Sequence, residues 1–387
     1  MSRRITQCFL DETDGCYFNH LLQSFIFVDS ELSRFCLAQI ETGCDIQSLV
    51  KDIVTVFGKP AEEVSKDLEQ LVPGVLDSCL PYPTSIASNA EIFRNANRPA
   101  EIPCNLSAVR EIAGISVRIG FNAPAELSAF QHITFGSLAT ENKADLCDIA
   151  IVRTDDNYCV KTNSTVLDEN ISLNTACLYA YNIAEDLAAK RLDPLVIFHA
   201  GGIQHKTSKK VAIFPGLGNT GKSTLMYGLA SQGHGLLNDD VIPFLEHGSI
   251  MALGSTVKLR EGSWQLCSSQ QSILNTIPTI LSDAERLKLI RFENDATEQL
   301  QQAGVNLRAS HIIVPEYNPA AEPQTIEISK STALQAIISA ESIFKKPVTH
   351  KAIAQLSEWL RNTICYKIRY HNLETALIQT DKILTTG

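Results

Sequence analysis

The sequence predicts an α/β fold: a mixed sheet domain built around a glycine-rich loop, preceded by a small winged-helix-like module of three strands and three helices. Two short runs, residues 195–198 and 211–214, are wholly apolar, as expected of central strands covered on both faces. The second run leads directly into the glycine-rich loop, and a helical pattern follows over residues 223–232. Together these observations favour a strand–loop–helix core for the larger part of the chain.

The first eighty residues form a unit of their own in this prediction. Asp14-Gly15 is a hairpin signal between the first two of three short apolar stretches, at residues 8–10, 16–18 and 25–28. Three amphipathic helical patterns follow, and Pro60 opens the third. We therefore place a first domain at residues 1–80, a polar linker at 81–104 and the larger domain at 105–387. In the larger domain the patterns predict strands at 115–119, 147–152 and 158–160 and a helix over 178–190.

Composition argues against several classes of protein. The formal net charge is -10 and no basic run occurs, which argues against a nucleic-acid partner. No window approaches the length of apolar sequence that a membrane span needs, so none is predicted. The 11 cysteines are scattered without metal-binding spacing, which favours reduced, buried thiols. With no export signal at the N-terminus, we expect a cytoplasmic protein.

The glycine-rich loop carries the strongest chemical signal in the chain. Residues 216–223 match the P-loop pattern G-x-x-x-x-G-K-S in full. Backbone N–H groups and a helix N-terminus bind nucleotide phosphates in this arrangement. Lys222 is expected on the β- and γ-phosphates and Ser223 on Mg²⁺, so ATP and Mg²⁺ are the predicted cofactors. The expected nucleotide-binding residues of the loop are Gly216, Gly218, Asn219, Thr220, Gly221, Lys222, Ser223 and Thr224.

Two aspartates and a histidine extend this site. Asp239 and Asp240 follow an apolar stretch, and the first lies sixteen residues after Ser223, in a Walker-B-like arrangement. One carboxylate is expected to hold Mg²⁺ through water, and the other to accept the proton of a substrate hydroxyl. The alternative is a polar turn after a strand. His199 follows the apolar run at 195–198, and a structural and a functional role are both open for it.

These residues resemble the catalytic region of the HPr kinase family and its kinase-like relatives. The resemblance rests on His199, on residues 216–224, on Gly233-His234 and on Asn238-Asp239-Asp240, and it covers roughly residues 105–385. It implies that Asp239 is the general base and that His199 and Lys222 lie in the active site. We assign Mg²⁺ to Ser223 and Asp240. Residues 309–315 and 365–370 are also similar in pattern to those relatives.

One segment departs from that family. Its regulatory enzymes carry a glycine-rich E-I-R-G-L-G segment after the aspartates, whereas this chain has S-T-V-K-L-R-E-G at residues 255–262. The departure puts in doubt a reverse, phosphate-removing activity and also HPr as substrate. Lys258 and Arg260 in this segment are candidates for contacting nucleotide or substrate phosphate, with solvated strand charges as the alternative.

The N-terminal module resembles the PqqD-like recognition elements of peptide-modifying enzymes in its pattern of three strands and three helices. That resemblance implies that a leader peptide binds as an added strand. The expected groove lies between the segment from Gln23 to Val28 and the segment from Glu62 to Leu71. The alternative is a packing module without a ligand.

The fusion of the two modules predicts a kinase that transfers the γ-phosphoryl group of ATP to a Ser or Thr hydroxyl of a ribosomally synthesised precursor peptide. Two alternatives stay open: a kinase of a free small molecule such as an amino acid, and a nucleotide-gated peptide-binding protein without transfer chemistry. Because HPr kinases assemble, a homo-oligomer is a further possibility that the resemblance raises.

Overall fold

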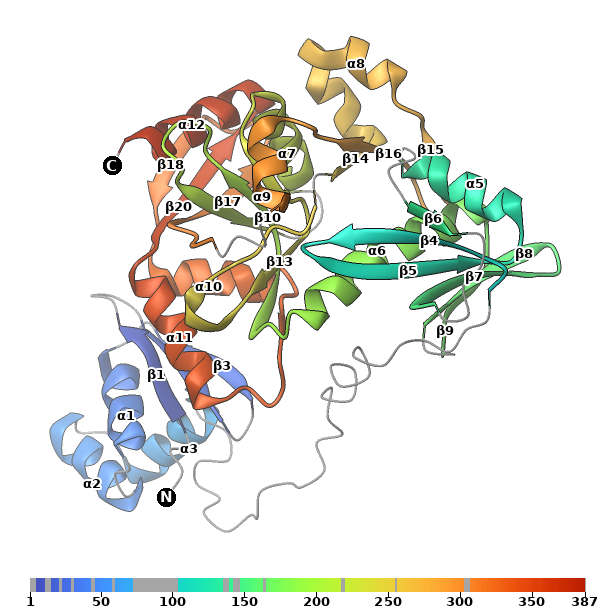
Figure 1. The fold of residues 1–387 in the computed structure, drawn as a ribbon. Coiled ribbons are helices and arrows are strands. Elements are labelled where there is room, and N and C mark those ends of the chain that lie inside the picture. The colour runs from blue at the N-terminus through green and yellow to red at the C-terminus, as the bar shows by residue number, and fades with distance from the viewer. Residues whose placement is uncertain are drawn as a thin grey trace.

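The computed structural model describes residues 5–10, 15–20, 23–28, 31–42, 46–57, 60–71, 104–134, 139–141, 147–162, 165–216, 220–254, 256–302 and 307–386. Within them the fold is mixed α/β, as the sequence predicts, and contains sheets of three, eight, three and six strands. In Figure 1 the N-terminal module lies below the eight-stranded sheet, and the six-stranded sheet lies beside it.

The N-terminal module has the predicted order of three strands followed by three helices. These elements are β1 (Ile5–Leu10), β2 (Gly15–Asn19), β3 (Ser24–Val28), α1 (Glu31–Glu41), α2 (Ile46–Phe57) and α3 (Ala61–Leu71). The strands form an antiparallel sheet in the order β1-β2-β3. Successive side chains of β2 point to opposite faces. Tyr17 therefore enters the core shared with the three helices, while Cys16 and Phe18 point away from it.

That second face packs on the larger domain. Cys16 and Phe18 belong to the same buried core as Trp359 of α11 (His350–Arg361). Gln23 accepts a hydrogen bond from the Val348 backbone N–H at 2.5 Å and donates one to the Val348 carbonyl at 3.5 Å. The module is therefore joined to the larger domain by a common core. The predicted linker at 81–104 lies outside the described residues except for Cys104.

The eight-stranded sheet contains the strand that precedes the glycine-rich loop. Its order is β12-β10-β11-β17-β20-β18, with β13 and β19 also paired to β10. β11 runs parallel to β17, which runs parallel to β20; the pairs that involve β10 and β18 are antiparallel. The bounds are β10 (Val196–Gln204), β11 (Val211–Pro215), β12 (Gly235–Asn238), β13 (Val241–Phe244), β17 (His311–Tyr317), β18 (Gln324–Glu327), β19 (Ile343–Phe344) and β20 (Ile364–Tyr370).

Both faces of this sheet are covered, as the apolar runs predict. Val211 and Ile213 of β11 enter a core with α10 (Lys330–Ser339) and α11. Ala212 and Phe214 enter a separate core with α7 (Lys222–Ser231) and α12 (Leu373–Thr385). A strand buried on both faces cannot alternate apolar and polar residues, which is why this run is continuously apolar.

The six-stranded sheet, in the order β6-β4-β5-β7-β8-β9, carries two helices. Its strands are β4 (Leu106–Ile112), β5 (Ile115–Phe121), β6 (Ala139–Glu141), β7 (Ile149–Thr154), β8 (Asn157–Thr162) and β9 (Thr165–Ile171). Its helices are α5 (Pro124–Ile133) and α6 (Leu173–Arg191). The predicted strands at 115–119, 147–152 and 158–160 and the predicted helix at 178–190 are thus confirmed. Helix α6 packs on this sheet and also contacts β13, so it bridges the two sheets.

A third sheet pairs β14 (Thr256–Arg260) with β16 (Arg286–Arg291), and β16 with β15 (Ile280–Leu281). The short helices η2 (Glu261–Gln270) and α8 (Gln271–Thr276) connect β14 to β15, η1 (Glu246–Gly248) follows β13, and α9 (Asp295–Gln302) follows β16.

One strand of the eight-stranded sheet is longer than the apolar run that predicts it. The strand that contains residues 196–198 does not end at His199 but continues as β10 through Gly201 and Gly202 to Gln204. The glycines are required by close packing rather than by a turn. A Cβ atom at Gly201 would lie 2.6 Å from Met226 Sδ, and one at Gly202 would lie 2.9 Å from Ile242 Cδ1.

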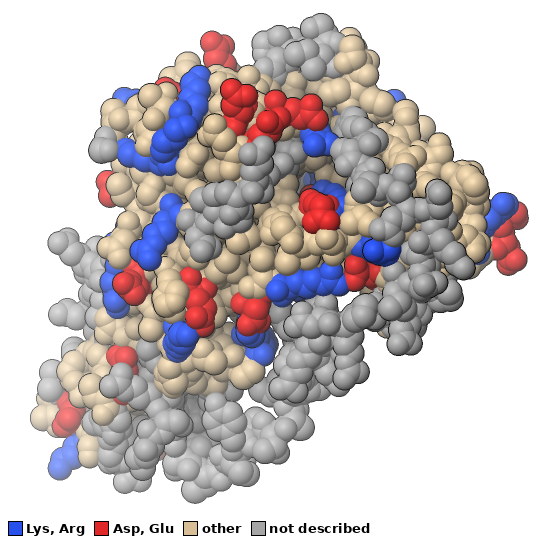
Figure 2. Space-filling model, viewed as in Figure 1, with Lys and Arg blue, Asp and Glu red and all other residues tan. Residues whose placement is uncertain are grey.

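Surface and burial agree with the composition where the structure describes them. On the face shown in Figure 2, Lys and Arg side chains are intermixed with Asp and Glu. All nine described cysteines are buried, as predicted. Among the described residues, no helix has both the length and the apolar character required to cross a membrane.

Candidate active site

The end of the glycine-rich loop is shaped by the start of α7. This helix begins at Lys222, directly after Gly221, whose φ of 85° lies in the left-handed region that favours glycine. A Cβ atom at Gly221 would also lie only 2.3 Å from Tyr370 Oη. The Tyr370 hydroxyl donates a hydrogen bond of 3.2 Å to the Thr220 carbonyl, which ties the loop to β20. Two predicted loop residues, Gly218 and Asn219, lie outside the described residues.

The aspartate pair follows β12 in a turn that the side chain of Asn238 stabilises. Asn238 Oδ1 accepts the backbone N–H groups of Asp240 at 2.7 Å and Val241 at 2.8 Å. An Asn side chain that accepts from the next two or three residues stabilises a tight reversal of the chain. The reversal leads from β12 into β13 and directs the two neighbouring carboxylates to different environments.

Asp240 is the partly exposed carboxylate, and three nitrogen groups converge on it. Lys222 Nζ and His199 Nε2 each lie 2.7 Å from Asp240 Oδ1, and Lys258 Nζ lies 3.9 Å from Asp240 Oδ2. Burial opposes ionisation, but the hydrogen bond from His199 and the charges of Lys222 and Lys258 hold the pKa of Asp240 well below its usual range. Four of the predicted site residues therefore meet at one point.

Asp239 is the buried carboxylate, only 2% exposed. Its Oδ2 accepts the Lys258 backbone N–H at 3.0 Å, while its Oδ1 has no hydrogen-bond partner among the described residues. Burial raises the pKa of Asp239 to about 6, and the charge of Asp240 adds to that rise. A buried acceptor without a partner is unfavourable, which is a common feature of sites that act on a ligand.

The position of His199 follows from the antiparallel pairing of β10 with β11. Because β10 is antiparallel to β11, Ala200 lies opposite Pro215, where β11 ends and the loop begins. His199 is therefore beside the loop from the middle of a strand.

A cavity of about 650 Å³ opens at this cluster. Its wall includes nine predicted residues: His199, Gly221, Lys222, Ser223, Thr224, Asp239, Asp240, Lys258 and Arg260. Arg260 is also paired with Glu285, with 2.5 Å between Arg260 Nε and Glu285 Oε2. The donor set fits the predicted cofactors. The N-terminus of α7 and the lysines suit a triphosphate, and Ser223 and Asp240 offer the hard oxygen ligands that Mg²⁺ takes.

Residues that the sequence analysis did not single out also belong to the site. Asn182 lines the cavity from α6, and Tyr317 and Tyr370 line it from β17 and β20. Glu185, one turn after Asn182, lies 3.8 Å from Lys258 Nζ. No sharp signal in the sequence marked Glu185, because α6 also carries Asp186, Lys190 and Arg191, and any of these charged positions could have faced solvent.

A second polar cluster, His205, His234 and Asp381, has potential ligand atoms within 4.8 Å of one another but does not suit a metal. The Ser208 backbone N–H donates to His205 Nδ1 at 3.0 Å. The Lys206 backbone N–H donates to His234 Nδ1 at 3.2 Å. A ring nitrogen that accepts such a bond carries no hydrogen, so the ring hydrogen lies on Nε2 in both residues. Metal-bound histidines instead coordinate through one nitrogen and donate from the other. The cluster is better explained as a hydrogen-bonded tie from His205 to Asp381 of α12, 2.9 Å long.

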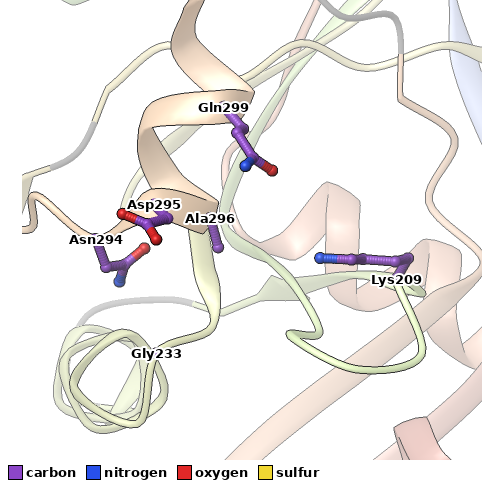
Figure 3. Close-up of a pocket in the computed structure, with 6 residues that line it drawn as sticks. All are labelled: Lys209, Gly233, Asn294, Asp295, Ala296 and Gln299. Carbon is purple, nitrogen blue, oxygen red and sulfur yellow. The ribbon is translucent and has the colours of Figure 1, made fainter.

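Figure 3 shows another hollow, of about 430 Å³, between the β10–β11 turn and the start of α9. Lys209 extends toward that helix start, where Asn294 Oδ1 accepts the Thr297 backbone N–H at 2.8 Å. The helix start is thus already capped by its own residues. The cavity beside Asp240 is the stronger candidate site because it alone, of these two, combines predicted residues with an unpartnered buried carboxylate oxygen.

Comparisons with known proteins give little beyond this geometry. No family model and no curated protein matches the sequence. Among solved structures, one match is the HPr(Ser) kinase/phosphatase from Coxiella burnetii, with 16% sequence identity and a TM-score of 0.23. The match covers 49% of this chain and 99% of that chain. At this TM-score the match carries no argument about function.

Proposed function

We propose that this protein is an ATP-dependent kinase that phosphorylates a Ser or Thr hydroxyl of a ribosomally synthesised precursor peptide bound through its leader. The observation that carries the proposal is the convergence of Lys222, His199 and Lys258 on Asp240, beside the N-terminus of α7 and inside a cavity of about 650 Å³. Fixed N–H groups and ammonium groups around a cavity stabilise the charge of a phosphoryl group in transfer.

Each residue has a role in this proposal. When the nucleotide binds, the Lys222 ammonium leaves Asp240 and contacts the β- and γ-phosphates. The first N–H groups of α7 bind the same phosphate oxygens. Ser223 and Asp240 hold Mg²⁺, which neutralises phosphate charge when bound. His199 orients the Asp240 carboxylate through their 2.7 Å contact.

Asp239 accepts the proton of the acceptor hydroxyl. Its pKa of about 6 lies near neutral pH, which suits a general base. Its Oδ1 is buried and without a partner among the described residues, so this role requires the side chain to turn toward the cavity when the acceptor binds. Catalytic hydrogen bonds commonly form only in the substrate complex.

The N-terminal module supplies the leader site in this proposal. Among the described strands, β3 is paired only with β2, so one side of β3 is an open edge. An extended peptide can add to such an edge through main-chain hydrogen bonds. The groove proposed for the leader lies between this edge and α3.

The test uses the full-length protein with γ-labelled ATP, Mg²⁺ and a precursor peptide encoded beside its gene, with and without the leader. We expect label on a Ser or Thr of the peptide and a higher KM when the leader is absent. Asp239→Asn should lower kcat by about 10²- to 10⁴-fold while ATP affinity is kept. Deleting residues 1–80 would be a poor test, because Cys16 and Phe18 belong to the core of the larger domain.

Other outcomes would point to the alternatives. Equal turnover of a free hydroxy amino acid, without any leader effect, would indicate a small-molecule kinase. ATP binding without transfer to any hydroxyl would indicate a nucleotide-gated binding protein. Unchanged turnover in Asp239→Asn would remove Asp239 from the mechanism.

A further inference from the structure

A chain of buried and partly buried charges leads from α6 to the active site, and the roles above do not include Glu185 at its far end. We propose that Glu185 is a positioning residue that holds the Lys258 ammonium where the transferred phosphoryl group lies. The proposal rests on phosphoryl transfer at this site and extends it, since it assigns the control of one catalytic charge to a helix outside the eight-stranded sheet.

Three ion pairs in series define the chain. Arg110 Nη2 lies 2.9 Å from Glu185 Oε1, Lys258 Nζ lies 3.8 Å from Glu185 Oε2, and Lys258 Nζ lies 3.9 Å from Asp240 Oδ2. The Glu185 side chain is 3% exposed, so little solvent screens these contacts. The two oxygens of Glu185 thus serve two different cations.

Glu185 is itself held firmly. Arg110 donates from Nη1 to the Tyr181 carbonyl at 2.8 Å, and its guanidinium lies 3.6 Å from the centre of the Tyr181 ring. A stacked and hydrogen-bonded guanidinium has lost most of its freedom before it binds a carboxylate. Arg110 therefore orients Glu185, and Glu185 in turn presents one oxygen to the cavity side of α6.

Lys258 is held between two carboxylates without a hydrogen bond to either. Both separations exceed hydrogen-bond length, and the structure shows no hydrogen bond from this ammonium to a described residue. Burial opposes its charge, but Glu185, Asp240 and Asp239 raise its pKa, so the ammonium stays protonated. A partly buried ammonium with unused donors in a cavity wall is prepared to bind an anion.

Removing Glu185 should release this ammonium toward the aspartates. Asp240 then remains as the nearest ion-pair partner, and Lys258 would use its donors there. The nucleotide itself would still bind through Lys222 and α7. The expected loss is therefore confined to the part of binding that involves the transferring phosphoryl group.

The experiment measures the affinity of the full-length protein for Mg²⁺ and ADP, with and without aluminium fluoride, a mimic of the phosphoryl group in transfer. In Lys258→Met we expect the fluoride-dependent gain in affinity to fall by about 10- to 100-fold, with ADP affinity unchanged. Glu185→Gln should lose most of the same gain, and Glu185→Asp should recover part of it. The variant that combines Glu185→Gln with Lys258→Met should lose no more of the fluoride-dependent gain than Lys258→Met alone.

A surface pair provides the matched control. Glu246 Oε1 lies 2.6 Å from Lys351 Nζ, with both side chains about half exposed, and Glu246→Gln should leave the fluoride-dependent gain unchanged. The positioning role is refuted if Glu185→Gln weakens the binding of ADP alone as much as the binding of ADP with aluminium fluoride. It is also refuted if the losses of affinity from Glu185→Gln and Lys258→Met add in the double variant. A wild-type protein that binds ADP but never the fluoride also overturns it. A fluoride complex without peptide phosphorylation would count only against the proposed acceptor.

Discussion

Replacing Gly221 by alanine tests the geometry of the nucleotide loop. Gly221 has a φ of 85°, and an added Cβ would lie 2.3 Å from Tyr370 Oη and 3.2 Å from Tyr317 Cβ. The substitution therefore has two costs, one from backbone conformation and one from overlap with the tyrosines. Gly233 provides a matched control, because its φ is 87° and, its chain neighbours aside, no described atom lies within 4 Å of the position of an added Cβ.

The two costs can be separated in magnitude. A left-handed conformation costs a non-glycine residue about 1–2 kcal/mol, and forcing extra atoms into a packed site costs about 1–3 kcal/mol more. We therefore expect Gly233→Ala to lose about 1–2 kcal/mol and Gly221→Ala about 2–5 kcal/mol of stability. Tyr370→Phe removes the closest contact at the cost of one hydrogen bond to the Thr220 carbonyl, worth about 1 kcal/mol.

The assay is urea unfolding of the wild-type protein, the two alanine variants and Gly221→Ala combined with Tyr370→Phe, followed by circular dichroism. Gly221→Ala should have the lowest midpoint, and the double variant should recover toward Gly233→Ala. ATP affinity should fall in Gly221→Ala and stay near the wild-type value in Gly233→Ala. Equal midpoints for the two alanine variants would refute the packing of Tyr370 against the loop.

Three further predictions concern charge, pH and the N-terminal module. Lys222→Met should weaken ATP binding by about tenfold or more, measured by calorimetry, because a charge-assisted phosphate contact is lost. Burial and the neighbouring His205 lower the pKa of His234 to about 4, so its contribution to stability is intact above about pH 6.5 and falls by up to about 3 kcal/mol toward pH 4. His234→Asn should flatten that part of the curve of unfolding midpoint against pH, and an unchanged slope would contradict the assignment. Gln23→Ala removes both hydrogen bonds to Val348 and should raise hydrogen exchange in β3 without affecting β7.

Local patterns in the sequence were enough for much of the fold. The order of elements in the first 71 residues followed from apolar spacing and turn signals. The strand and helix around the glycine-rich loop followed from a motif whose phosphate chemistry itself requires that context. The role of His199 stayed open, because its place inside β10 depends on the close approach of Met226 and Ile242 to Gly201 and Gly202.

Within the candidate site, the sequence by itself determined which residues are candidates for binding phosphate and metal: Lys222 and Ser223 lie in one strand–loop–helix unit, and the aspartate pair follows the next strand. Only the tertiary structure decided that, of the two aspartates in the cavity wall, Asp240 is partly exposed and Asp239 is buried, because burial depends on which strands and helices pack around a turn. It alone placed Glu185 of α6 beside Lys258 of β14, 73 positions apart by their numbers. The tertiary structure also packed one face of the N-terminal sheet, which carries Cys16 and Phe18, against α11. Such contacts leave no periodic trace in the chain, since charge pairing and core packing across sheets depend on distance in space and not on spacing in sequence.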